Sequence, residues 1–205
     1  MDVAPQPIDT IIFDLGGVLI DWNPRYLYKK VFVDPGAMEF FLTEICHGEW
    51  NHLQDAGRPW KDAIEDRIEH FPEYEAEIRM FYERWSEMLG GVNEDTLDLL
   101  NILATESNLR LLALTNWSAE TWVLACERYD FLKLFEGIVV SGEEKIAKPD
   151  PAIFKLLCNR YQVDPAHALF IDDSEANVIG ARSIGLNAIH YQDDSQLREE
   201  LEEWL

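Results

Sequence analysis

Short apolar runs recur along the chain, and each is bounded by polar residues. Four runs are clear and a fifth is weaker: TIIFDL (10–15), LRLLALTN (109–116), EGIVVS (136–141), HALFID (167–172) and the weaker LNAIHYQ (186–192). Runs this short and this apolar are typical of buried strands rather than helices. The pattern therefore predicts five strands, four of them with little polar character.

Segments in which apolar residues recur at helical spacing lie between these runs and after the last one. They are NEDTLDLLNILATES (93–107), SAETWVLACERYDFL (118–132), DPAIFKLLCNRYQV (150–163), SEANVIGARSIG (174–185) and the acidic tail QLREELEEWL (196–205). Ser118 is a candidate N-cap, because a Ser side chain can accept a hydrogen bond from a free N–H of the first turn. Strands that alternate with helices predict an α/β fold, with a Rossmann-like parallel sheet and right-handed crossovers.

Residues 22–92 show a different pattern, in which aromatic and charged residues are frequent and buried-strand runs are missing. Helical segments there include WKDAIEDRIEHF (60–71) and EYEAEIRMFYERWSEML (73–89). Apolar residues at helical spacing in such segments indicate core packing within a helical bundle. Four residues carry this spacing: Ile78, Phe81, Trp85 and Leu89.

This change of pattern divides the chain. We predict an α/β core made of residues 1–21 and 93–205, with an all-α helical cap of residues 22–92 inserted after the first strand. Gly90 and Gly91 form a natural hinge for the return of the chain, because glycine adopts backbone conformations closed to other residues.

The charge of the chain narrows the classes of partner. The 205 residues carry a formal net charge of −22, from 17 Lys and Arg against 39 Asp and Glu, with 47% hydrophobic and 27% charged residues. Such acidity argues against binding to nucleic acids and to anionic membranes. It leaves a small anionic substrate open, because a bound Mg²⁺ and a few local cations can invert the field inside one pocket. We expect a monomer or a homodimer.

Cysteine content and the N-terminal residues favour a cytoplasmic protein. Cys46, Cys126 and Cys158 are too few and too far apart for a disulfide framework or a zinc site. The opening residues MDVAPQPIDT lack the basic and apolar regions of a signal peptide. No run approaches the roughly 18 apolar residues of a membrane span. We therefore expect a cytoplasmic enzyme or binding protein.

Polar residues stand where four of the predicted strands end. They are Asp14 after the first run, Thr115 and Asn116 at the end of the second, Lys148 after the third, and Asp172 with Asp173 after the fourth. Each also has an ordinary explanation as a turn, helix-capping or solvated loop residue. Parallel strands, however, bring their carboxyl ends to one edge of a sheet, where ligands bind. The four together therefore predict a functional site.

The residue types at these strand ends suit phosphoryl transfer. The Asp14 carboxylate can attack phosphorus and form an aspartyl-phosphate, which divides one difficult step into two easier ones. Mg²⁺ prefers hard oxygen ligands, which Asp14, Asp172 and Asp173 can supply. Hydroxyl, amide and ammonium groups can hold the phosphoryl oxygens. In this scheme they come from Thr115, Asn116 (through its amide or its backbone) and Lys148.

The ordered motifs DLGGVL (14–19), LLALTN (111–116), KPDP (148–151) and FIDDSEAN (170–177) resemble those of the haloacid dehalogenase superfamily of hydrolases. The resemblance covers nearly the whole chain, with a core in two pieces and a helical cap between them. It implies a further metal ligand, the backbone carbonyl of Gly16.

Two details place the chain within that superfamily. The acidic pair Asp172–Asp173 favours a Mg²⁺-dependent phosphatase over a metal-independent dehalogenase-like hydrolase. Gly16 departs from the usual Asp-x-Asp motif of the phosphatases, whose second Asp acts as general acid and base. The DLG form of the motif is similar to that of phosphatases acting on glucose 1-phosphate, so we expect sugar phosphates as substrates. Asp9 and Asp21 are nearby carboxylates that could replace the missing group.

Other functions stay open at this point. A phosphoacceptor signalling protein also combines an acceptor Asp with an acidic pair, Thr and Lys, but in a different order. A catalytically weak member would bind Mg²⁺ and a phosphorylated ligand only. In the cap, HGEWNHLQDAGRPW (47–60) offers residues for substrate binding, among which we select Trp50. The alternative is that Trp50 and Trp60 belong to the core of the cap.

Overall fold

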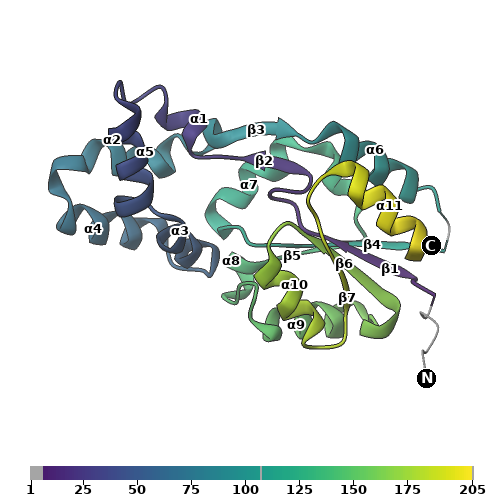
Figure 1. The fold of residues 1–205 in the computed structure, drawn as a ribbon. Coiled ribbons are helices and arrows are strands. Elements are labelled where there is room, and N and C mark those ends of the chain that lie inside the picture. The colour runs from purple at the N-terminus through teal and green to yellow at the C-terminus, as the bar shows by residue number, and fades with distance from the viewer. Residues whose placement is uncertain (1–6, 107, 205) are drawn as a thin grey trace.

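A central parallel sheet organises the molecule in a computed structural model, which describes residues 7–106 and 108–204. Its strand order is β5-β4-β1-β6-β7. The strands are β1 (Thr10–Phe13), β4 (Arg110–Thr115), β5 (Gly137–Val140), β6 (Ala168–Asp172) and β7 (Asn187–His190), and every neighbouring pair is parallel. All five predicted strands are thereby confirmed, and so is the Rossmann-like fold class (Figure 1).

The central strand β1 is buried on both faces, and its residues alternate between two hydrophobic clusters. Ile11 and Phe13 belong to one cluster and Ile12 to the other, as the alternation of side chains along a strand requires. One face is covered by α6 (Glu94–Leu103), α7 (Ala119–Arg128) and α11 (Asp194–Trp204), and the other by α9 (Pro151–Tyr161) and α10 (Glu175–Arg182).

These five helices match the helical segments expected from the sequence, and Ser118 caps α7 by accepting the N–H of Glu120. A short helix, α8 (Ser141–Glu144), directly follows β5. Residues 107 and 205, which the predicted segments included, lie outside the described residues. The same holds for most of the opening stretch on which the signal-peptide expectation rests.

Residues 23–88, which we call the helical insert, gather at one end of the molecule, on the left in Figure 1. Its helices are α1 (Arg25–Tyr28), α2 (Pro35–Phe40), a π-helical turn (Phe41–Ile45), α3 (Gly48–Asp55), α4 (Trp60–His70) and α5 (Glu75–Glu83), with 3₁₀ turns at Pro72–Tyr74 and Trp85–Met88. Buried aromatic rings pack together at its centre. Aromatic side chains bury large apolar areas, which stabilises so small a bundle.

A two-stranded antiparallel ribbon, which the sequence did not predict, connects the insert to the core. It pairs β2 (Ile20–Trp22) with β3 (Leu89–Val92), so the chain enters and leaves the insert side by side. The expected hinge at Gly90 and Gly91 lies inside β3. A Cβ at Gly90 would collide with the side chains of Asp21 and Tyr26, so a larger residue there would have to displace them. The division into two domains stays a prediction.

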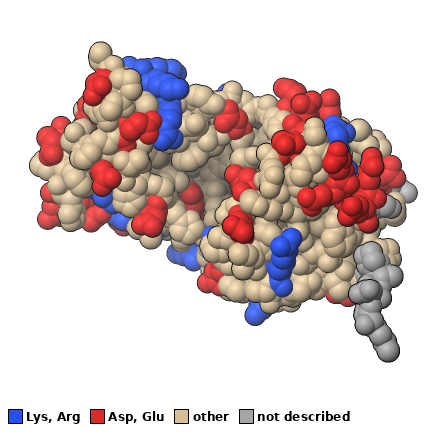
Figure 2. All heavy atoms as spheres, viewed as in Figure 1, with Lys and Arg blue, Asp and Glu red and all other residues tan. Residues whose placement is uncertain are grey.

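The outer surface is rich in carboxylates. Figure 2 shows Asp and Glu side chains spread over the visible face and gathered over α6 and α11, with few Lys or Arg among them. None of the helices in the described part of the chain combines the length and the apolar character that crossing a membrane requires.

Candidate active site

Asp14 directly follows β1, and its backbone is fixed by the neighbouring strand. Its N–H donates to the Ile171 carbonyl at 2.8 Å, and its Oδ1 accepts the N–H of Leu15 at 2.7 Å. The next turn is closed by the Leu15 carbonyl, which accepts the N–H groups of Leu19 and Ile20 at 2.9 and 2.7 Å. The residue is 6% exposed, so this carboxylate is nearly buried at the carboxyl edge of the sheet.

The two glycines after Asp14 serve different purposes. Gly17 has a φ of +77°, and a Cβ there would collide with the carboxylate of Asp173. Both the backbone conformation and the close approach of Asp173 therefore require glycine at this position. Gly16, in contrast, has no atom within 4 Å of the place where a Cβ would be. A side chain at Gly16 would extend into open space.

Asp14, Asp172 and Asp173 form the acidic cluster that the sequence predicted. One oxygen from each lies within 4.8 Å of the others. Burial raises the pKa of Asp14 well above its usual value, and the Asp172 and Asp173 charges raise it further, while Lys148 opposes them. The pKa of Asp173 is likewise raised, by burial and by Asp172. Asp14 and Asp172 are buried and Asp173 is exposed, so the cluster opens to the surface on one side. Like charges this close favour a bound cation, and carboxylate oxygens fit Mg²⁺.

Lys148 is buried in the centre of the site. Its Nζ lies 2.9 Å from Asp14 Oδ1, and donates to Asp172 Oδ2 at 2.7 Å and to the Leu114 carbonyl at 2.9 Å. Burial lowers the pKa of the ammonium, but Asp14 and Asp172 outweigh it, so the pKa is raised. An ammonium has three N–H donors, and these three partners take all of them. The alternative of a solvated loop lysine is therefore wrong.

The Asn116 side chain holds Lys148 in place. Its Nδ2 donates to the Lys148 carbonyl and its Oδ1 accepts the Lys148 N–H, both at 2.9 Å. Asn116 was expected to meet a phosphoryl group through its amide or its backbone. The bond to the Lys148 carbonyl uses one of the two N–H donors of the amide, so both ways stay predictions. Thr115 differs, because its buried Oγ1 has no hydrogen-bond partner among the described residues. This hydroxyl can therefore bind a ligand.

Asn177 is a site residue that the sequence reasoning missed. It lies in α10, and its Nδ2 donates to both carboxylate oxygens of Asp172, at 3.0 and 3.1 Å. The N–H of Ser174 also donates to Asp172 Oδ1 at 2.8 Å. The sequence offered one signal for this residue, which is an amide side chain in the first turns of the helix that follows the acidic pair. These bonds fix the orientation of Asp172.

A cavity of about 90 Å³ lies beside this cluster, between the core and the insert. It is lined by Gly16, Trp22, Asn51, Asp55, Trp85, Asn116 and Trp117. The space-filling view shows the surface hollowed between the two parts of the molecule (Figure 2). A second cavity of about 330 Å³ extends into the insert and shares Trp22 and Asn51 with the first. The site therefore continues from the sheet edge into the insert.

The selection of Trp50 for substrate binding is wrong. Its ring is 1% exposed and packs edge-on against Trp60 and Phe81, with centroids 5.6 and 5.2 Å apart, and it lines neither cavity. Trp50 and Trp60 belong to the core of the insert, as the alternative held. The same helix, α3, presents Asn51 and Asp55 to the cavity instead, and Asp55 was not among the predicted residues.

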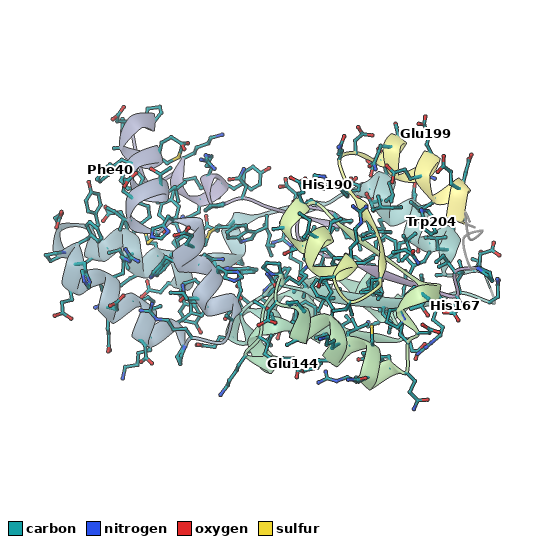
Figure 3. The ribbon with its side chains drawn as sticks, turned by 60° about the horizontal axis from the view of Figure 1, so that its bottom comes forward. Phe40, Glu144, His167, His190, Glu199 and Trp204 are labelled. Atoms are coloured by element: carbon teal, nitrogen blue, oxygen red, sulfur yellow. The ribbon has the colours of Figure 1, made fainter. Side chains whose placement is uncertain are left out.

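Neither carboxylate suggested as a replacement at Gly16 reaches the cavity. The Asp9 N–H donates to the His167 carbonyl, and Figure 3 labels His167 at the end of the sheet far from the insert. His190, also labelled there, lies at the opposite end, with Nε2 3.0 Å from the Asp173 carbonyl. Asp21 is exposed on β2 and accepts the hydroxyl of Tyr26.

Comparison with known proteins identifies the class to which this site belongs. A family model for haloacid dehalogenase-like hydrolases matches residues 8–185, and the chain therefore belongs to that family. The resemblance inferred from the four motifs is thereby confirmed. So is the expectation of an enzyme in the phosphoric monoester hydrolase class of this superfamily, at the level of the class.

Curated relatives span most of the chain. The chain is 28% identical over 191 residues to the phosphorylated carbohydrates phosphatase of Thermotoga maritima, covering 89% of this chain and 84% of that protein. It is 26% identical over 183 residues to a sesquiterpene phosphatase of Aspergillus oryzae, covering 89% of each. Proteins similar to this chain are thus named as phosphatases of very different compounds.

A solved structure is similar along the whole fold. It is a haloacid dehalogenase family enzyme from Bacteroides thetaiotaomicron, the wild-type protein in complex with magnesium and inorganic phosphate. The TM-score is 0.68 at 26% sequence identity, covering 93% of this chain and 98% of the other.

Proposed function

We propose that the protein is a Mg²⁺-dependent phosphatase that hydrolyses small phosphorylated metabolites through an aspartyl-phosphate on Asp14. One observation carries the proposal: the Asp14 carboxylate, the buried Lys148 ammonium and the Asp172–Asp173 pair meet at one point. The free hydroxyl of Thr115 ends the neighbouring strand β4. A nucleophile, a fixed cation, a set of hard oxygen ligands and a free donor are the parts that phosphoryl transfer requires.

The contacts of Asp14 assign roles to its two oxygens. The Leu15 N–H and Lys148 Nζ both bind Oδ1, so we assign Oδ2 as the oxygen that attacks phosphorus. The bond from phosphorus to the leaving oxygen breaks as the bond to Oδ2 forms. Water then attacks the same phosphorus, releases phosphate and restores the carboxylate.

The remaining groups stabilise charge. Lys148 has no free N–H, so it acts by its charge and by orienting Asp14 and Asp172. The Thr115 hydroxyl and the Asn116 backbone bind phosphoryl oxygens. Asp14, Asp172, Asp173 and the Gly16 carbonyl would hold Mg²⁺, which neutralises phosphate charge when bound.

Three residues that line the cavity carry unpaired polar atoms, which supports a hydroxylated substrate, with sugar phosphates first. Trp22 Nε1, Trp117 Nε1 and Asn51 Oδ1 are buried and have no partner among the described residues. Two buried donors and one buried acceptor without partners destabilise the folded protein, and a ligand that pairs with them removes this cost. Sugar hydroxyls fit such a set, and the name of the Thermotoga maritima relative points the same way.

The alternative of a metal-independent dehalogenase-like hydrolase is less well supported, because it gives the adjacent carboxylates of Asp172 and Asp173 no cation to bind. A weak member that only binds Mg²⁺ and a phosphorylated ligand is distinguished by turnover. A cytoplasmic location, and a monomer or homodimer without nucleic-acid or membrane partners, stay predictions.

Phosphate release tests the proposal. Wild-type protein is assayed with and without Mg²⁺ against sugar phosphates, nucleotides and an aryl phosphate, with Asp14→Asn as control. We expect release that depends on Mg²⁺ and is lost in the variant. Equal release by Asp14→Asn, or release unaffected by removal of Mg²⁺, would contradict the mechanism, and no release from any substrate would contradict the function.

A further inference from the structure

The cavity beside Gly16 contains a carboxylate that the mechanism above does not use. Asp55 is the last residue of α3 and lines this cavity together with Gly16 and Asn116. Among the described residues that line it, Asp55 is the sole ionisable one. Gly16 contributes no side chain, and the space where its Cβ would be is open. A proton carrier for this cavity must therefore come from the insert.

Asp55 belongs to the insert but is bound to the core. The Ser141 hydroxyl donates to the Asp55 carbonyl at 2.5 Å and accepts the N–H of Trp117 at 2.9 Å. Asn51 Nδ2 donates to Asp55 Oδ2 at 3.0 Å, and the backbone N–H of Ser118 is close enough to the carboxylate to lower its pKa. These bonds place the carboxylate next to the end of β4, where Thr115 and Asn116 lie.

The surroundings of Asp55 suit reversible proton transfer. Burial raises its pKa to about 7, and the Ser118 N–H opposes this shift. The charged groups of the elements packed around it are Glu120 of α7, which accepts the Trp60 N–H, and Lys145 after α8, which lies against Gly57. On the core side are Lys148 and the acidic cluster. A carboxyl group with a pKa near the working pH can both donate and accept a proton.

We propose that Asp55 is the general acid and base of this enzyme, replacing from the insert the side chain that Gly16 lacks. The proposal rests on the proposed phosphatase function. In the first step the bond from phosphorus to the leaving oxygen breaks, and that oxygen takes the proton of the Asp55 carboxyl group. In the second step the Asp55 carboxylate takes a proton from the water that attacks the phosphorus bound to Asp14. Asp55 is then protonated again, and Asp14 is free.

The test compares substrates that differ in their need for a proton. A sugar phosphate releases an alkoxide that must be protonated, whereas p-nitrophenyl phosphate releases a stable phenolate. We expect Asp55→Asn to slow sugar phosphate hydrolysis by about 10²- to 10⁴-fold, as is typical for loss of a general acid. With p-nitrophenyl phosphate the variant should give a rapid burst of one p-nitrophenolate per enzyme, followed by slow turnover. The matched control is Asp62→Asn, an exposed carboxylate of the insert.

Two further measurements separate proton transfer from a structural role. The Asp55 carboxyl carbon, followed by NMR in the metal-free protein, should titrate near pH 7, and its signal is assigned by its loss in Asp55→Asn. Gly16→Asp placed in the Asp55→Asn background should recover at least about tenfold in sugar phosphate hydrolysis, because the space at Gly16 admits the new side chain.

The outcomes distinguish this proposal from the proposed function. If Asp55→Asn hydrolyses sugar phosphates at the wild-type rate with an unchanged pH profile, Asp55 carries no proton and the phosphatase assignment stands. If the variant loses sugar and aryl phosphate hydrolysis equally, without a burst, the role is structural and the proposal is again overturned. Loss of the phosphatase function itself would appear as inactivity of the wild-type protein.

Discussion

The sheet edge and the helical insert meet at one cavity but are built in opposite ways. At the sheet edge the charged side chains are bonded to one another, since Lys148 joins Asp14 to Asp172 and Asn177 holds Asp172. On the insert side, Trp22 and Asn51 carry buried polar atoms without partners among the described residues. The charged groups of the sheet edge are thus fixed before a substrate arrives, with the Thr115 hydroxyl left unpaired beside them, whereas Trp22 and Asn51 leave polar atoms for the substrate to pair.

This difference indicates a division of labour. Groups that are already in place stabilise the charge of the transition state without having to move during the reaction. Electrostatic catalysis obtains most of its effect in this way. Unpaired groups discriminate among ligands, because a ligand that cannot pair them leaves them buried and unsatisfied. We therefore expect changes at the sheet edge to act on the chemical step and changes in the insert to act on substrate choice.

The largest expected effect belongs to the nucleophile. Asp14→Asn should reduce kcat by about 10⁴-fold or more, because an amide neither attacks phosphorus nor forms the aspartyl-phosphate. Steady-state phosphate release measures the loss. Asp9→Asn, at the other end of the same strand region, is the control and should keep near-wild-type kcat. Comparable losses in the two variants would mean that the site is not at the carboxyl edge of the sheet.

Removal of the buried ammonium should affect both chemistry and stability. Lys148→Ala leaves Asp14 and Asp172 as uncompensated buried charges, which costs about 3–5 kcal/mol in the free energy of unfolding. We expect kcat to fall by about 10²-fold or more, in line with loss of one preorganised electrostatic contact. Chemical denaturation and phosphate release check the two effects, with the exposed Lys133→Ala as control. An unchanged midpoint would contradict the buried ion-pair geometry.

The two adjacent glycines offer a sharper comparison within the sheet edge. Gly17→Ala should lower the free energy of unfolding by about 1–3 kcal/mol, since it forces a left-handed backbone and a collision with Asp173. Gly16→Ala should change it by less than about 0.5 kcal/mol, because its Cβ meets nothing. Denaturation curves of both variants measure the two changes. Equal losses of unfolding free energy would contradict the described conformation of the turn after Asp14.

A pair of tryptophans, Trp22 of the ribbon and Trp50 of the insert, tests the opposite side of the cavity in the same way. Trp22→Phe removes an unpaired donor from the cavity and should raise KM for a sugar phosphate about fivefold, with little loss of stability. Trp50→Phe should leave KM unchanged and lower the free energy of unfolding by about 1–2 kcal/mol, because its ring lies in the insert core. The reverse pattern would restore Trp50 as a substrate-binding residue.

A pH dependence of stability is also expected. The folded state raises the pKa of Asp55 from 3.8 to about 7, so folding favours the protonated form and Asp55 destabilises the protein increasingly as pH rises from about 4 to 7. Asp55→Asn removes this cost. The free energy of unfolding of the variant, relative to that of wild type, should therefore be higher at pH 8 than at pH 4 by on the order of 1–3 kcal/mol. Thermal unfolding of both proteins at the two pH values measures this difference. An equal difference at both pH values would contradict the shifted pKa.

The sequence predicted the α/β core well because its strands are almost wholly buried. Runs such as those of β1 and β6 have no polar face, so their pattern is unambiguous. The ribbon of β2 and β3 was missed because three or four residues, two of them glycine, are too few to show alternation. Helix α3 was missed because it buries only Trp50 and Gln54, which leaves a weak periodic signal.

The site was predictable where strand ends determine it and unpredictable where tertiary contacts do. Asp14, Lys148, Asp172 and Asp173 were brought together as the topology of a parallel sheet requires. The engagement of the Asn116 amide by the Lys148 backbone depends on a loop path that no local pattern records. Asp55 resembles many acidic residues of this chain, and only its half-buried position beside the N-cap of α7 distinguishes it.

The paired strands β2 and β3 give the insert one more property. Trp22 and Leu89 face each other across the ribbon, so the chain leaves the core and returns to it at the same place. The whole insert is therefore a cassette that could be exchanged for another of different length without altering the register of the central sheet. If Asp55 carries the proton, such an exchange would replace the substrate pocket and the acid–base group together. The core would then keep only the capacity to form the aspartyl-phosphate.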